Sequence, residues 1–294
     1  MGAVGFYLFY GINWIITLLP LRVLYLFADL LFLILYYFPS YRRKVVATNL
    51  KNAFPEKSAD ELLKIEKGFY KHLADLIVET LKMTNMSSKM FKKRFSVTNL
   101  EIVNKLINEG RDIVGISAHY NNWEWMSAIP LFIDIKCVSI FKPLKNKLFD
   151  KFFNDLRKKH GMVLTPGSNI VREIIAARNK GINSLFAFIA DQIPAKGDIK
   201  YRTQFLNQNT PVYLGAEKIA AKYDMAVVFF NNQKTKRGHY SLTPELLFEH
   251  TAGLPEYAVT EAHVRRLEEL IIEKPEYWIW SHRRWKHKQE LQDD

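Results

Sequence analysis

Two long apolar stretches open the chain, before any regular alternation of polar and apolar residues begins. Residues 3–19 include no charged residue, and Asp29 is the only charged residue in the stretch 23–38. As an α-helix the first run would extend about 26 Å, close to the minimum that crosses a bilayer core. The pattern predicts a membrane anchor over residues 1–40, either one transmembrane helix or a helical hairpin lying in one leaflet.

The apolar block has two other interpretations. A cleaved signal peptide needs a basic segment before the apolar run and a small-residue cleavage site after it, and this chain has neither. A hairpin buried in the protein core is the remaining alternative to the anchor. Basic residues follow the block at Arg42, Arg43 and Lys44, which favours a cytoplasmic location for the rest of the chain.

Beyond residue 41, helical and strand-like spacings alternate. Ser58 and Glu61 form a capping-box pattern ahead of a helix with apolar residues every three or four positions. Further helices are predicted at residues 99–109, 122–128, 149–159, 168–178, 210–222 and 255–273. Buried strands are predicted at residues 113–117, 136–141, 163–164, 185–190, 225–230 and 239–242. This alternation favours one α/β domain over residues 41–294, with a mixed sheet flanked by helices, and a frayed tail over residues 289–294.

Composition narrows the class of protein. With 48% hydrophobic residues among 294, the chain is not intrinsically disordered. Its single cysteine, Cys137, excludes an internal disulfide or a multi-cysteine metal site, and we expect neither a metal nor a cofactor. A net charge of +12 indicates an anionic partner. Nucleic acid is disfavoured, because the chain combines an apolar anchor with no basic-aromatic recognition motif.

The sharpest candidate for chemistry is His119, which follows the predicted strand 113–117, with Glu124 five residues later. Histidine titrates near neutral pH and can accept a proton from a hydroxyl, while a carboxylate can orient the ring. A second pair, His263 and Glu268, lies within one predicted helix, where five residues separate side chains by about 140°. His119 and Glu124 are therefore the candidate pair, and a structural turn histidine is the alternative.

Several ordered motifs resemble one bacterial family. They are RRKVVATNLKNAFPEKS, HYNNWEW, ADQIP, TQFLNQNTPVYLGAEKIAAKYDMAVVFF and PEYWIWSHRRWK. Nearly the whole chain is similar to the lipid A biosynthesis acyltransferases, the late lauroyl and myristoyl transferases. The resemblance implies a glycerolipid-acyltransferase-like fold and direct acyl transfer from acyl carrier protein to a hydroxyl of a lipid A precursor. His119 would be the general base, and Glu124 would orient it.

The resemblance also implies partners and a location. The acidic acyl carrier protein and the anionic inner leaflet would account for the positive charge, and the catalytic domain would face the cytoplasm at the bacterial inner membrane. A related membrane acyltransferase acting on another glycolipid, phospholipid or aminolipid is the alternative function. The presence of both His119 and Glu124 disfavours an inactive scaffold.

Further residues are candidates for substrate binding. Two cations are alternative candidates for stabilising the oxyanion or a phosphate, Lys142 and Arg157. Members of the family often have an arginine in the region of Lys142, and lysine keeps the charge but lacks the planar guanidinium. Asp191 and Gln192 follow a predicted strand and could line the acceptor site. Thr210 is a further candidate, because it lies at a predicted helix start that either binds an anion or is a plain N-cap. Arg283 and Arg284 belong to an aromatic-basic cluster near the C-terminus, which either binds lipid headgroups or has a structural packing role.

Overall fold

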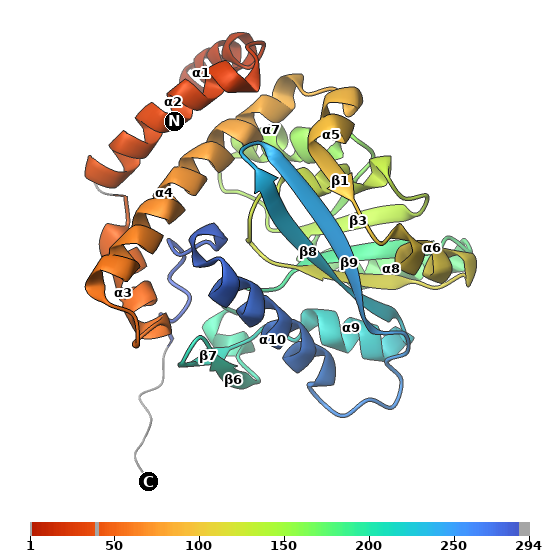
Figure 1. The fold of residues 1–294 in the computed structure, drawn as a ribbon. Helices are drawn as coiled ribbons and strands as arrows, with labels where there is room; N and C mark the ends of the chain where they lie inside the picture. The colour runs from red at the N-terminus through yellow and green to blue at the C-terminus, as the bar shows by residue number, and fades with distance from the viewer. Residues whose placement is uncertain (1, 39–40, 288–294) are drawn as a thin grey trace.

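A mixed seven-stranded sheet forms the centre of the protein in the computed structural model, which describes residues 2–38 and 41–287 (Figure 1). The strand order is β1-β9-β8-β2-β5-β3-β4, and every neighbouring pair is parallel except β8 with β9. The strands are β1 Phe95–Val97, β2 Ile113–Ser117, β3 Lys136–Phe141, β4 Val163–Pro166, β5 Ser184–Ile189, β8 Ala226–Lys236 and β9 His239–Phe248. A separate antiparallel hairpin joins β6 (Arg202–Phe205) and β7 (Gln208–Pro211). The predicted mixed α/β sheet is confirmed.

Helices cover both faces of the sheet, because alternate residues of its central strands point to opposite sides. In β8, Val227 and Phe229 belong to one apolar core, while Val228 and Phe230 belong to the other. The helices that complete the domain are α3 Arg43–Ala53, α4 Ala59–Lys82, α5 Ser88–Arg94, α6 Leu100–Asn108, α7 Lys147–Lys158, α8 Ile170–Asn179, α9 Gly215–Tyr223 and α10 Ala258–Glu273. Short 3-10 turns lie at η1 Met83–Asn85, η2 Trp125–Leu131, η3 Gly167–Asn169, η4 Lys196–Asp198 and η5 Pro275–Tyr277.

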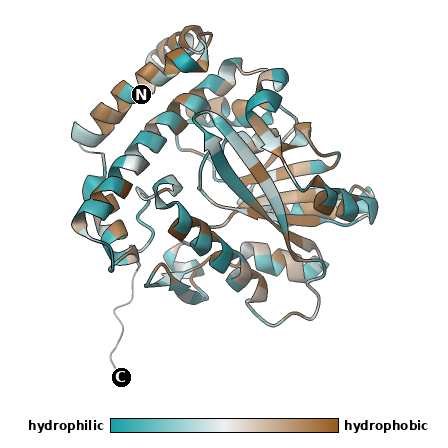
Figure 2. Ribbon diagram, in the orientation of Figure 1, coloured by the Kyte–Doolittle hydropathy of each residue, from teal (hydrophilic) through white to brown (hydrophobic). Residues whose placement is uncertain are grey.

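The N-terminal apolar block folds as a helical hairpin of α1 (Ala3–Ile16) and α2 (Leu21–Tyr37), and α2 packs along α4 (Figure 1). One side of the hairpin is buried, and the rest exposes large apolar side chains. Much of the hairpin ribbon is brown in Figure 2, the colour of hydrophobic residues. In the described part of the chain, no helix has both the length and the apolar character needed to cross a membrane. The transmembrane form of the predicted anchor is therefore not supported.

Two predicted helices differ from those observed. Residues 208–211 form β7 instead of starting a helix, because Thr210 pairs with Thr203 across the β6–β7 hairpin, and α9 begins only at Gly215. The segment after His119 forms the 3-10 turn η2 in place of a helix over 122–128, and Pro130 lies inside it. The capping box at Ser58 and Glu61 is confirmed. The predicted tail lies outside the described residues.

One buried carboxylate joins the hairpin, the sheet and the turn after β2. Glu79 of α4 is fully buried and accepts hydrogen bonds of 2.7 Å from the hydroxyls of Tyr25 and Tyr240 and from Nδ2 of Asn122. Its backbone carbonyl accepts a further bond from Nε1 of Trp125. Burial raises the pKa of Glu79, while the two tyrosine hydroxyls oppose that rise. The turn that carries His119 and Glu124 is thereby fixed to α4.

We expect Glu79→Ala to lower the free energy of unfolding by about 3 kcal/mol, because it leaves three buried donors without their acceptor. Urea denaturation followed by circular dichroism measures the effect. Asp60→Ala, on the exposed first turn of the same helix, is the control and should cost less than about 1 kcal/mol. Equal destabilisation by the two substitutions would contradict the assigned role of Glu79.

Candidate active site

The register between β2 and β5 brings two polar side chains together. These parallel strands pair Ser117 with Ile189, so residues two positions further along each strand, His119 and Asp191, emerge opposite each other. The backbone supports this arrangement, because the amide of Ala190 donates to the carbonyl of Ser117. Nδ1 of His119 lies 2.7 Å from Oδ1 of Asp191. The pair thus sits at the carboxyl edge of the sheet, where α/β folds bind ligands.

Asp191 is a buried carboxylate that forms hydrogen bonds with two side chains. Its side chain is 1% exposed, and Oδ2 accepts a 2.8 Å hydrogen bond from Nε1 of Trp278. Burial alone would raise the pKa of Asp191, but the charge and hydrogen bonds of His119, together with Trp278, outweigh it and lower the pKa to about 2. The carboxylate is therefore ionised at neutral pH and acts only as an acceptor.

The ionised partner determines which ring nitrogen of His119 is available. Because Asp191 can only accept, Nδ1 carries the proton in this pair, and Nε2 of the neutral ring keeps its lone pair. Nε2 lies 3.2 Å from Nε2 of the exposed Gln192. The ring also packs edge-on against Trp123 at a centroid distance of 5.1 Å, and its side chain is 19% exposed. An oriented base therefore faces the surface beside an amide.

Glu124 does not join this pair. It forms a two-pronged ion pair with Arg157 of α7, with distances of 2.8 Å to Nε and 2.6 Å to Nη2. Burial would lower the pKa of Arg157, whereas the Glu124 carboxylate raises it. The expected contact between His119 and Glu124 is thus replaced by two separate pairs. The turn after β2, anchored through Asn122 to Glu79, directs Glu124 to α7.

The C-terminal segment packs against the turn that carries His119. The amide of Asn121, a residue in the left-handed region at φ 54°, donates to the carbonyl of Tyr277. Tyr120 forms a β-bridge with Trp278, whose indole reaches Asp191. Sequence reasoning missed the role of Trp278. Its partners lie far away in the sequence, and nothing in the aromatic cluster itself identifies which ring contacts the site.

Of the other predicted site residues, some lie near His119 or on the surface, and others are buried. Gln192 contacts His119, and Lys142 is exposed just after β3. Thr210 is buried within β7, where its hydroxyl donates to the carbonyl of Gln208 and accepts from Nε1 of Trp285, so it does not start a helix that could receive an anion. Arg283 is exposed, whereas Arg284 is buried and not positioned for a headgroup.

The arrangement is suited to acid–base chemistry on a hydroxyl. A buried carboxylate orients the imidazole and stabilises its protonated form, while Nε2 faces outward to exchange a proton. The ion pair of Glu124 and Arg157 adds a fixed guanidinium, a group that binds oxyanions. Within residues 2–38 and 41–287, no group of three or more His, Cys, Asp or Glu side chains is placed to hold a metal ion.

Comparison with known proteins identifies the family. The profile of the family described as bacterial lipid A biosynthesis acyltransferase matches residues 2–287. A lipid A biosynthesis palmitoleoyltransferase of Escherichia coli (strain K12) is 22% identical over 285 residues, covering 94% of this chain and 89% of that protein. A lipid A biosynthesis acyltransferase of Shigella flexneri matches with the same identity and coverage. The chain therefore belongs to the bacterial lipid A biosynthesis acyltransferase family, and it is an acyltransferase.

Proposed function

We propose that this protein transfers a fatty acyl chain from acyl carrier protein to a hydroxyl of a lipid A precursor, with His119 as the general base and Asp191 as its orienting partner. The observation that carries the proposal is the 2.7 Å contact between Nδ1 of His119 and the buried Asp191, which leaves Nε2 to accept a proton. Membership of the lipid A acyltransferase family supplies the acceptor class.

In the proposed reaction, the acceptor hydroxyl takes the position that the Gln192 amide has beside Nε2 of His119. His119 removes the hydroxyl proton while the oxygen attacks the thioester carbonyl. The tetrahedral intermediate then expels the carrier thiolate, which takes the proton back from His119. An ester and a free thiol result, and the enzyme returns to its starting protonation state. Asp191 stabilises the transient imidazolium throughout.

Arg157 is the favoured cation for the oxyanion or for an acceptor phosphate. Glu124 engages its Nε and Nη2, which leaves Nη1 outside the pair. A guanidinium fixed in this way costs little reorganisation when charge develops on the substrate. Lys142, exposed at the end of β3, is the second candidate. Glu124 then acts on the reaction by positioning Arg157 and has no direct contact with the base.

We further propose that the α1–α2 hairpin binds the cytoplasmic surface of the bacterial inner membrane. Leu26, Leu30 and Leu33 of α2 are 48–68% exposed. Exposed apolar helices of this kind insert into the headgroup region, and flanking basic residues such as Arg42 and Lys44 favour anionic lipid. Such binding would bring the site to a lipid acceptor.

His119→Ala and Asp191→Asn should each lower turnover at least about 100-fold, because one removes the base and the other the charge that orients it. The assay follows acyl transfer from acyl carrier protein thioesters to a lipid A precursor bearing Kdo sugars. His250→Ala is the matched control, since His250 forms an exposed pair with Asp224 at 3.0 Å and should behave as wild type. Near-normal turnover in His119→Ala would rule out the mechanism.

The membrane proposal is tested by replacing Leu26, Leu30 and Leu33 together with glutamate. These side chains are exposed, so the fold should persist while sedimentation with anionic vesicles is lost. Replacing Leu63, Leu246 and Ile272, which are exposed elsewhere, with glutamate is the control. If the hairpin variant sediments as fully as the wild type, the membrane surface lies elsewhere.

Docking of the acidic carrier should depend on exposed lysines of α7, the helix that ends beside the site. Changing Lys147 and Lys158 to glutamate should raise KM several-fold for the carrier thioester but not for an acyl-CoA donor. Lys159 is unsuitable for this test, because its ammonium is bound by the carbonyls of Met83 and Thr84. Lys180→Glu, at the opposite edge of the sheet, is the control.

High salt should weaken carrier use in the same way, because exposed charges are screened over about 10 Å at 0.1 M. The rate at subsaturating donor, measured across a salt series for both donors, gives the comparison. A parallel loss of activity with the two donors would mean that salt acts on the membrane or the acceptor, and the docking proposal would fail.

A further inference from the structure

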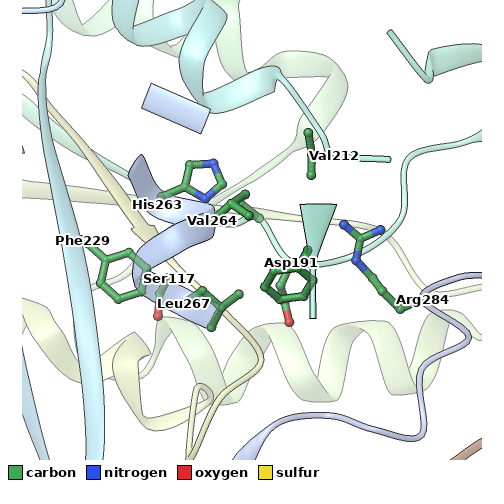
Figure 3. A pocket seen from close by; sticks show the side chains of 10 residues that line it. Ser117, Asp191, Val212, Phe229, His263, Val264, Leu267 and Arg284 are labelled. Atoms are coloured by element: carbon green, nitrogen blue, oxygen red, sulfur yellow. The ribbon is translucent and has the colours of Figure 1, made fainter. Parts of the chain in front are cut away.

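A small cavity is lined in part by Asp191. It has a volume of about 10 Å³, near the size that admits one water molecule. Its polar lining comes from Ser117, Asp191, His263 and Arg284, and apolar groups including Phe229 complete the wall (Figure 3). These side chains come from three strands or strand ends, from α10 and from the C-terminal segment. All five residues are buried.

Arg284 is the unusual member of this lining. It is 2% exposed, and its Nε and Nη1 contact no hydrogen-bond acceptor within the described ranges. A buried cation is costly unless an opposite charge compensates it. Burial lowers the pKa of Arg284 to about 10, and the Asp191 carboxylate acts against this decrease. Arg284 therefore stays charged at neutral pH, and Asp191 is the acidic residue that lines the same cavity.

The other titratable groups that face the cavity do not supply a second cation at neutral pH. Burial lowers the pKa of His263 on α10 to about 4, against the attraction of Asp191. His282 lies outside the cavity lining, and burial lowers its pKa to about 4 as well, although Asp191 opposes that change. Asp191 thus contacts His119 directly and lines the same cavity as Arg284.

We propose that Arg284 is a positioning residue that offsets the charge of Asp191 and so keeps His119 in its neutral, proton-accepting form. A buried carboxylate beside an imidazole favours the imidazolium, which cannot accept a proton. A cation near the carboxylate reduces that preference, while the hydrogen bond that orients the ring remains. The inference rests on the proposed function, in which His119 removes a proton.

The experiment compares pH profiles of kcat/KM for the wild type and Arg284→Met. With the cation removed, the acidic limb should move to higher pH by about one unit, and activity should recover in alkaline buffer. Arg284→Lys keeps the charge and should leave the limb within about 0.3 unit of the wild type. Lys286→Met removes an exposed charge from the same segment and should not move the limb.

The outcomes separate this inference from the proposed function. An unchanged acidic limb in folded Arg284→Met, with His119→Ala inactive, would overturn the role of Arg284 alone. An active His119→Ala would overturn the base and this inference with it. If circular dichroism shows that Arg284→Met is unfolded, Arg284→Gln decides: an acidic limb displaced to higher pH by about one unit supports the role of the charge, and a limb like that of the wild type refutes it.

Discussion

The site depends above all on the parallel register between β2 and β5. Pairing Ser117 with Ile189 places His119 and Asp191 side by side, two residues beyond paired positions on adjacent strands. A shift of one residue would turn every β2 side chain to the opposite face of the sheet and exchange its apolar contacts, so the core that stabilises the fold also determines the geometry of this pair.

Two buried carboxylates then connect segments that are distant in the sequence. Asp191 accepts from His119 and Trp278, and Glu79 accepts from both the hairpin and the turn after β2. A buried carboxylate is stable only when donors surround it, so each one requires its partners to be in place. This requirement fixes the C-terminal segment against one side of the catalytic turn and α4 against the other.

The surface around these buried groups carries both apolar and charged side chains. The hairpin exposes leucines along α2, and α7 carries exposed lysines on the helix that also supplies Arg157. Arg284 is buried and lines the cavity beside Asp191, although its sequence neighbour Arg283 is exposed. Two adjacent arginines in the same motif thus have different environments, because the C-terminal segment turns one side chain into the core and the other outward.

The sequence by itself determined the α/β class, the capping box at Ser58, most strands of the sheet and the position of His119 at a strand end, because these follow from local periodicity and local hydrogen bonds. It did not determine that 208–211 is a strand, since only pairing with β6 distinguishes that segment from a helix start. Nor could it assign the partner of His119. Glu124 is near in sequence and Asp191 is 72 residues away, yet the contact follows from strand register and from the turn that directs Glu124 to Arg157. Such choices belong to the tertiary structure, because they depend on which distant segments the core brings together.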